Sequence, residues 1–279
     1  MTSADSVPTR ALNDGSSIPA VGFGTWPLKG AEAEEGAADA LRAGYRLVDT
    51  AANYGNETEV GRGIAGSGVP REEVVVTTKL PGRHHGHRAT LDSFEESRRR
   101  LGVERVDLYL IHWPLPRIDQ YVASWQAMIE LRERGAVRSI GVSNFTPEHL
   151  GRLEDETGVL PAVNQVEMHP LFPQDELRAF HAEKGIVTES WSPLGRGGEL
   201  LDDPAIVEVA RAHGVTPGQA VLRWHLQLDA VPIPKSGGGR RRRDNIDLFG
   251  FELSDDEMAA VGDRSPRRLG GDPEHHEEF

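Results

Sequence analysis

Three ionisable side chains, Asp49, Lys79 and His112, each stand at the end of a short apolar run, and Tyr54 follows Asp49 in the segment "DTAANYG". A neighbouring ammonium group favours the phenolate form of a tyrosine and lowers its pKa. The sequence therefore predicts that Lys79, held by Asp49, lowers the pKa of Tyr54. Tyr54 would then give a proton to a carbonyl oxygen that His112 orients. Such a site needs a hydride carrier, which indicates a nicotinamide cofactor.

Each of these residues also has an ordinary structural interpretation. Asp49 suits a helix cap, Tyr54 a half-buried loop position, Lys79 a solvated strand end and His112 a structural role. Their joint placement on successive strand ends, with a tyrosine in the loop that can reach them, favours the catalytic interpretation.

The elements that must position these side chains alternate along the chain. Short apolar runs such as "VVVTTKL" and "VDLYLIHW" alternate with amphipathic, glycine-terminated segments such as "ATLDSFEESRRRLG". This pattern predicts an α/β fold, a (β/α)₈ TIM barrel over about residues 18–250, as one domain spanning 1–279. Asp14-Gly15 predicts an N-terminal β-hairpin that caps the barrel floor, and the polar tail 262–279 is expected to be loosely ordered. An open dinucleotide-binding sheet is disfavoured, because no G-x-G-x-x-G follows the first strand.

Composition narrows the classes of protein and partner. The chain has 279 residues, no cysteine and a net charge of -13. The absence of cysteine excludes thiolate chemistry, and the acidic balance argues against nucleic acid as a partner. No apolar run approaches the ~20 residues that a membrane span needs, and the N-terminus does not resemble a secretory signal. We therefore expect a cytoplasmic protein with no membrane association. By default we take it to be a monomer, and the residues above indicate a small-molecule carbonyl substrate.

Eight segments taken together resemble the aldo-keto reductases in sequence and order, from about Leu12 to Val261. They are "GFGTW", "RLVDTAANYGNE", "VVVTTKL", "VDLYLIHWP", "SIGVSNF", "NQVEMHP", "ESWSPLG" and "IPKS". Within that family the chain is most similar to the bacterial 2,5-diketo-D-gluconate reductase group. The resemblance implies a barrel that binds NADPH/NADP⁺ and reduces aldehydes and ketones, among them keto-sugars such as 2,5-diketo-D-gluconate.

The resemblance also implies roles for individual residues. Tyr54 would be the general acid, tuned by Lys79 and Asp49, and His112 would orient the carbonyl. The cofactor-binding residues would be Gly24, Thr25, Ser143, Asn144, Gln165, Trp191, Ser192, Leu194, Lys235, Ser236, Arg241, Asp244 and Asn245. Among these, Trp191 would stack on the nicotinamide, and Lys235, Ser236 and Arg241 would hold the 2′-phosphate. Phe23, Trp26, Trp113 and His112, with the loop around Arg196, would shape the substrate pocket.

The segment "GGGRRRRDN" departs from the family pattern. Arg241 keeps the family spacing from Lys235 and is the predicted phosphate ligand, whereas Arg240, Arg242 and Arg243 stay open between a basic clamp and a solvated charge run. The histidines His84, His85 and His87 lack a matching carboxylate, so no metal site is predicted.

Two other functions remain open at this point. One is a cofactor-binding sensor with little turnover, and the other is a hydrolase or aldolase that uses Lys79 as a Schiff base. The complete set of proton-transfer groups favours the reductase over the sensor. The basic "KSGGGRRRR" segment has no role in an aldolase.

Overall fold

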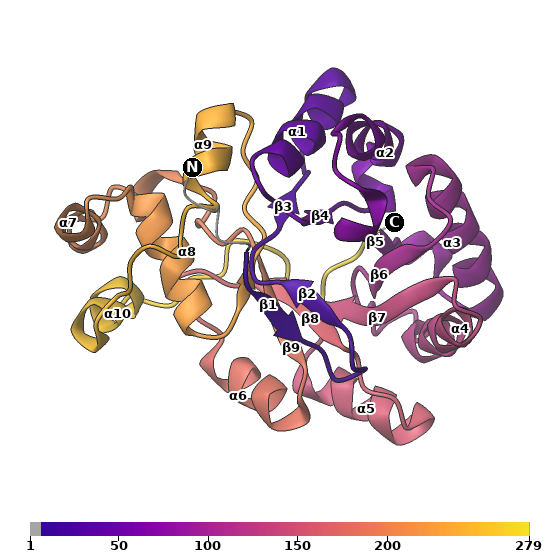
Figure 1. Cartoon of the computed structure of the whole chain (residues 1–279). Helices are drawn as coiled ribbons and strands as arrows, with labels where there is room; N and C mark the ends of the chain where they lie inside the picture. Colours follow the sequence, from indigo (N-terminus) through magenta and orange to yellow (C-terminus); the bar gives the residue numbers. More distant parts are fainter. Residues whose placement is uncertain (1–6, 279) are drawn as a thin grey trace.

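Eight short parallel strands form the centre of the computed structural model, which describes residues 7–278 (Figure 1). They are β3 (Phe23–Gly24), β4 (Leu47–Asp49), β5 (Val75–Leu80), β6 (Val106–Ile111), β7 (Val137–Ser143), β8 (Val163–Glu167), β9 (Val187–Trp191) and β10 (Val231–Pro232). Neighbours in sequence are neighbours in the sheet. The backbone N–H groups of Gly22 and Gly24 donate to the carbonyls of Pro232 and Pro234, at 3.0 and 3.1 Å, which joins the first strand to the last. The predicted (β/α)₈ barrel is confirmed.

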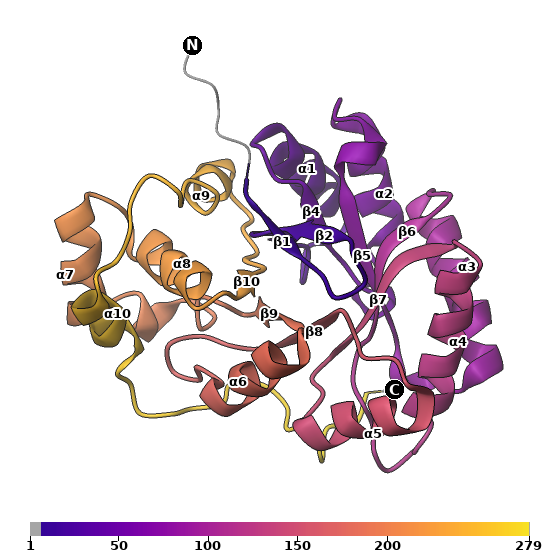
Figure 2. The same cartoon turned by 60° about the horizontal axis from the view of Figure 1, so that its bottom comes forward.

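The helices surround the sheet (Figure 2). They are α1 (Gly30–Arg42), α2 (Glu57–Gly66), α3 (His87–Leu101), α4 (Tyr121–Glu133), α5 (Pro147–Thr157), α6 (Asp175–Lys184), α7 (Pro204–His213), α8 (Pro217–Gln227), α9 (Gly239–Asp244) and α10 (Asp255–Gly262). Single 3₁₀ turns occur at η1 (Ala52–Tyr54), η2 (Arg71–Glu73), η3 (Gly82–His84) and η4 (Gly198–Leu200). None of these helices is both long and apolar enough to cross a membrane, as far as residues 7–278 are concerned.

The predicted hairpin is present as β1 (Thr9–Ala11) paired antiparallel with β2 (Ser17–Pro19). It lies across one end of the barrel in Figure 1. Leu12 and Ile18 from the hairpin are buried together with Leu47, Leu108 and Val163 of the strands. Strand residues that face inward thus form a plug of apolar side chains, which closes the floor and leaves the opposite end for polar groups.

A larger apolar core fills the layer between strands and helices, and it includes Val48, Val76, Tyr109, Phe94 and Leu41. Alternate strand residues contribute to this outer core and to the barrel interior, as the period of two in a strand requires. Some helices approach very closely: a Cβ on Gly63 of α2 would lie 2.3 Å from the carbonyl oxygen of Glu34 in α1. Only a glycine allows that contact.

Two elements near the C-terminus differ from expectation. A helix is expected over about 240–248, but α9 ends at Asp244. Helix α10 was not predicted, although Ser254 and Glu257 form a capping box at its start.

The tail after α10 runs past α6 toward α4 and α5 (Figure 2). The sequence predicts a loosely ordered tail, whereas the structure gives it specific contacts at the barrel mouth. The main-chain N–H groups of Leu269 and Gly270 donate to the carboxylate of Glu167, at 2.5 and 2.8 Å.

Candidate active site

Polar side chains from several strands meet at the end of the barrel opposite the hairpin. Asp49 ends β4 and Lys79 lies near the end of β5. Asp49 pairs with Thr77 in the sheet, and Lys79 lies two positions beyond Thr77 on the same inward face. Lys79 Nζ therefore reaches back to both carboxylate oxygens of Asp49, at 2.7 Å each. Both side chains are buried, so the charges compensate each other inside the protein.

Tyr54 is held above this ion pair by a short turn. The hydroxyl of Thr50 donates to Asn56 Oδ1 at 2.7 Å, and Asn56 Nδ2 donates to the carbonyl of Leu28 at 3.0 Å. Gly55, at a φ of 58°, lets the chain turn directly after Tyr54. Lys79 Nζ consequently donates to the Tyr54 hydroxyl at 3.3 Å. The predicted proximity of the phenol and the ammonium is present.

The predicted direction of the Tyr54 pKa shift is wrong. Burial raises the pKa of Tyr54 more than the Lys79 ammonium lowers it, and the Asp49 carboxylate raises it further. Burial alone would lower the pKa of Lys79, but the Asp49 carboxylate and Tyr54 together raise it. Tyr54 is therefore a protonated phenol and Lys79 a firmly protonated ammonium at neutral pH.

A second carboxyl group, Glu189 on β9, lies inside the barrel beside this pair and was not predicted. Gln165 Nε2 donates to Asp49 Oδ2 at 2.9 Å and to Glu189 Oε2 at 2.8 Å. One ammonium faces two carboxyl groups here. Burial first, and then the Asp49 charge, raises the pKa of Glu189 to about 8, so Glu189 is the neutral member. The sequence signal that could have identified Glu189 is a glutamate within the apolar strand "IVTESW".

Further polar groups of the site lie at the ends of β7 and β9. Ser143 Oγ donates to the carbonyl of Gln165 at 2.7 Å, and Asn144 Nδ2 donates to the carbonyl of His112 at 2.9 Å. Trp191 Nε1 donates to Asn144 Oδ1 at 2.8 Å. Asn144 and Ser192 adopt left-handed backbone conformations, with φ of 65° and 51°. Such conformations are uncommon outside glycine and often occur at functional sites.

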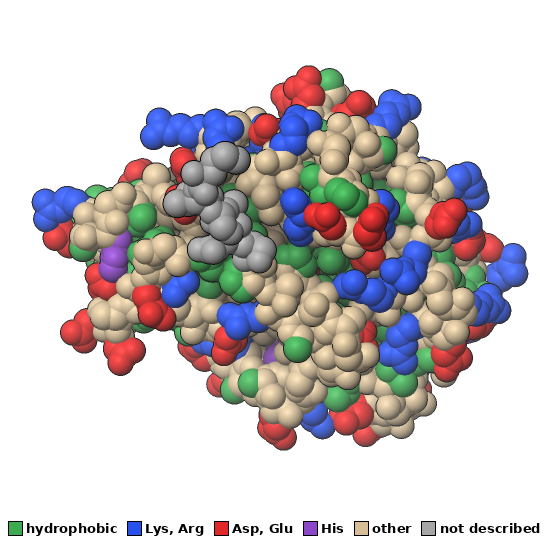
Figure 3. Space-filling view, viewed as in Figure 1, with side chains coloured by type: hydrophobic (Ala, Val, Ile, Leu, Met, Phe, Trp, Pro, Cys, Tyr) green, Lys and Arg blue, Asp and Glu red, His purple; other side chains and the backbone are tan. Residues whose placement is uncertain are grey.

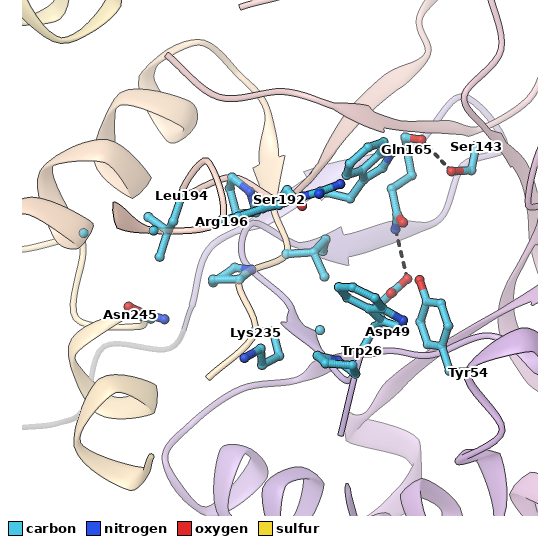
Figure 4. A pocket seen from close by; sticks show the side chains of 18 of the residues that line it. Trp26, Asp49, Tyr54, Ser143, Gln165, Ser192, Leu194, Arg196, Lys235 and Asn245 are labelled. Carbon is cyan, nitrogen blue, oxygen red and sulfur yellow. Dashed lines mark hydrogen bonds between the residues drawn. The ribbon is translucent and has the colours of Figure 1, made fainter. Parts of the chain in front are cut away.

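A single cavity of about 1020 Å³ joins these groups to the basic segment near α9. Figure 4 shows Asp49, Tyr54, Gln165 and Ser143 toward one end, and Leu194 and Asn245 toward the other. Lining residues that the sequence predicts are Gly24, Trp26, Asp49, Tyr54, His112, Trp113, Ser143, Asn144, Gln165, Trp191, Ser192, Leu194, Arg196, Lys235, Arg241, Asp244 and Asn245. Lining residues that the sequence does not predict include Thr216, Pro217 and Gly218 at the start of α8, and His276 and Glu278 of the tail.

Four predicted residues lie outside this lining: Lys79, which is fully buried beneath Tyr54, and Phe23, Thr25 and Ser236. Phe23 is fully buried and packs edge-on against Tyr45, with ring centroids 5.9 Å apart, so it does not shape a substrate pocket. The strand alternation explains this placement, because Gly22 and Gly24 face Ile233 in the barrel interior and Phe23 faces outward. Thr25 Oγ1 donates to the carbonyl of Asp49, and Ser236 Oγ to the carbonyl of Gly238, so both hydroxyls serve local structure.

The four arginines of α9 have different surroundings. Arg242 is 9% exposed; its Nε donates to Asp39 Oδ2 at 2.7 Å and its Nη1 to the carbonyl of Ser236 at 3.0 Å. Arg240 is exposed and lies 3.8 Å from Asp244. Arg241 lines the cavity together with Lys235, and within the described part of the chain neither is in an ion pair. Basic side chains project over α9 in Figure 3, whereas elsewhere on that face both signs are mixed.

The histidines after β5 have separate environments. His87 Nε2 lies 3.1 Å from Glu130, and burial lowers the pKa of His85 to about 4. Across residues 7–278 we find no group of three His, Cys, Asp or Glu side chains arranged to hold a metal ion.

Comparison with known proteins places this chain in a family. The sequence model of the Aldo/keto reductase family matches residues 20–263. The chain belongs to the aldo/keto reductase family. It is 53% identical over 274 residues to 2,5-diketo-D-gluconic acid reductase B of Corynebacterium sp. (strain SHS752001), covering 98% of this chain and 99% of that protein. As a member of the aldo/keto reductases it is an oxidoreductase.

Solved aldo/keto reductase structures have the same fold. A crystal structure of a Gox0644 mutant in complex with NADPH is 45% identical, with a TM-score of 0.92, and covers 96% of this chain and 98% of that one. The Bombyx mori aldo-keto reductase in complex with NADP is 35% identical, with a TM-score of 0.88, and covers 96% of each chain.

Proposed function

We propose that this protein reduces aldehyde and ketone carbonyl groups to alcohols with NADPH, and that Tyr54 supplies the proton. The observation that carries this proposal is the contact of the Tyr54 hydroxyl with Lys79 Nζ at 3.3 Å, above the buried Asp49 carboxylate. The same cavity contains Lys235 and Arg241. A proton donor and a set of cations that fits a phosphorylated cofactor thus share one space.

The residues of the cavity fit NADPH, as the complexes of Gox0644 with NADPH and of the Bombyx mori enzyme with NADP support. Lys235 and Arg241 would hold the 2′-phosphate, with Asp244 and Asn245 near the adenine. The remaining cofactor contacts that we propose are Gly24, Ser143, Asn144, Gln165, Trp191, Ser192 and Leu194. When bound, the cofactor supplies the hydride. Because Gln165 Nε2 already serves two carboxyl groups, its amide oxygen is the atom left for the cofactor carboxamide.

The raised pKa of Tyr54 suits reduction, because the phenol stays protonated until it is needed. An alkoxide is a far stronger base than a phenolate, so proton transfer from Tyr54 to the reduced carbonyl oxygen is downhill. The Lys79 ammonium then stabilises the phenolate that remains. His112, whose ring centroid is 5.8 Å from that of Tyr54, would hold the carbonyl oxygen.

A Schiff-base function for Lys79 is disfavoured. Imine formation needs a neutral amine, but Asp49 and Tyr54 raise the pKa of Lys79. An enzyme is favoured over a sensor, since Lys79 contacts both Asp49 and Tyr54, and the His112 ring lies edge-on to the Tyr54 ring.

NADPH deuterated at C4 tests the proposal. Two forms of labelled NADPH exist, because deuterium can replace either hydrogen at C4. When each is incubated with an aldehyde and this protein, only one form should give an alcohol that carries deuterium at the former carbonyl carbon. NADPH consumption without deuterated alcohol would reject the proposal. The similarity to 2,5-diketo-D-gluconic acid reductase B makes keto-sugars one candidate substrate class. We further propose that the enzyme works as a cytoplasmic monomer, for which light scattering checks the monomeric state.

A further inference from the structure

The C-terminal tail passes directly over the candidate active site. Its path is fixed by the main-chain hydrogen bonds of Leu269 and Gly270 to Glu167. A Cβ on Gly270 would lie 2.3 Å from the Trp191 ring, so the backbone rests against that ring. The tail therefore forms part of the wall where substrate must enter.

The end of the tail brings a carboxylate to His112. The His276 ring packs on Trp113, with centroids 3.9 Å apart. Glu278 Oε1 lies 2.7 Å from His112 Nδ1, and the N–H of Gly82 donates to Glu278 Oε2 at 3.2 Å. The Glu278 side chain is only 13% exposed and lines the cavity. His112 is thus bracketed by Tyr54 on one side and an anionic side chain on the other.

Within residues 7–278, Glu278 has no Lys or Arg partner; its one ion-pair partner is His112, which carries a charge only when its ring is protonated. Asp49 is neutralised by Lys79. Arg196 also lines the cavity, but Figure 4 shows it beside Ser192, away from Tyr54. Burial raises the pKa of Glu278, but His112 and hydrogen bonds from the Asn53 side chain and the Gly82 backbone lower it more, so Glu278 stays ionised.

The remaining wall at this end is aromatic. Trp26, Trp113 and Trp191 line the cavity, and Trp26 is 57% exposed at the rim. Such a wall binds apolar and aromatic groups and supplies no counter-charge to a carboxylate. An anionic substrate would place its charge near Glu278, and like charges repel.

We propose that Glu278 is a specificity-determining residue that selects uncharged and cationic carbonyl compounds over those bearing a carboxylate. This inference rests on the proposed carbonyl reduction. The inference predicts that this protein disfavours acidic substrates, whereas its relative 2,5-diketo-D-gluconic acid reductase B is named for an acid. For a substrate charge roughly 6 Å from the Glu278 carboxylate, at an effective dielectric constant of about 40, the expected discrimination is about tenfold.

Three aldehydes of similar size test the proposal: 4-nitrobenzaldehyde, 4-carboxybenzaldehyde and 4-(trimethylammonio)benzaldehyde. The readout is the ratio of kcat/KM for each charged aldehyde to kcat/KM for the neutral one. Glu278→Gln should raise the ratio for the anionic aldehyde about tenfold and lower the ratio for the cationic aldehyde. The matched control is Glu277→Gln, which removes a neighbouring tail carboxylate that pairs with Arg117 and does not line the cavity. It should leave both ratios unchanged.

The alternatives give different results. If Glu278→Gln raises kcat/KM equally for all three aldehydes, the tail acts as a steric plug and the charge proposal is wrong. Unchanged ratios in Glu278→Gln, or equal changes in both variants, also reject it. Failure to reduce even 4-nitrobenzaldehyde would instead count against carbonyl reduction itself, and the inference would fall with it.

Discussion

Replacing Glu189 by glutamine should remove a pH-dependent loss of stability. Glu189 is fully buried, and its pKa is raised from 4.5 to about 8 in the folded protein. The unfolded chain therefore releases this proton near its ordinary pKa, whereas the folded protein keeps it. Between these values unfolding becomes more favourable as pH rises, by about 1.4 kcal/mol per pH unit. Glutamine resembles the protonated side chain and can still accept the hydrogen bond from Gln165.

Thermal unfolding of the two proteins between about pH 5.5 and 7.5 measures this difference. The parental protein should lose about 2.7 kcal/mol relative to Glu189→Gln over that range, or about 5–10 °C in melting temperature. Other titrating groups cancel in the comparison, because both proteins contain them. Parallel pH dependence of the two melting temperatures would show that Glu189 is ionised in the folded state. Our charge assignment for the network around Lys79 would then be wrong.

Three further predictions concern the ion pair, the cofactor and helix packing. Lys79→Met should abolish reduction and destabilise the fold by about 3–5 kcal/mol, because it leaves Asp49 buried without a partner. Adding Asp49→Asn should restore stability but not activity. Carbonyl reduction by either variant would contradict the role of Lys79. Arg241→Ala should weaken NADPH binding about 10–100-fold and spare NADH, as fluorescence titration can show, whereas equal loss for both would remove Arg241 from the 2′-phosphate site. Gly63→Ala should lower the free energy of unfolding by about 1–3 kcal/mol, since its Cβ would lie 2.3 Å from the Glu34 carbonyl oxygen. An unchanged midpoint of denaturant unfolding would mean that α1 and α2 can move apart without cost.

The clustering of Asp49, Lys79 and Tyr54 was predictable because strand geometry fixes it. Asp49 and Lys79 follow apolar runs of adjacent parallel strands, and the ends of such strands meet at one edge. The same alternation could have placed Phe23 correctly, since Gly22 and Gly24 are the inward positions of that strand. The family resemblance implied a pocket position for Phe23, whereas the alternation of the strand turns its side chain toward the helices.

Effects that depend on burial and on distant chain segments were not predictable in the same way. The sign of the Tyr54 pKa shift depends on whether desolvation or the Lys79 charge is larger, which requires coordinates. The contact of Glu278 with His112 joins residues far apart in sequence through a tail without regular structure. Arg242 and Arg241 are adjacent and identical in type, and only the turn of α9 sends one to Asp39 and the other to the cavity.

The direct test of the central claim is the rate of carbonyl reduction by Tyr54→Phe, measured together with its affinity for NADPH. Phenylalanine keeps the ring and removes the hydroxyl that contacts Lys79 Nζ at 3.3 Å. We predict that kcat falls by ~10² or more while the dissociation constant for NADPH stays within about twofold of the parental value. A Tyr54→Phe enzyme that reduces aldehydes at the parental rate would show that another group supplies the proton.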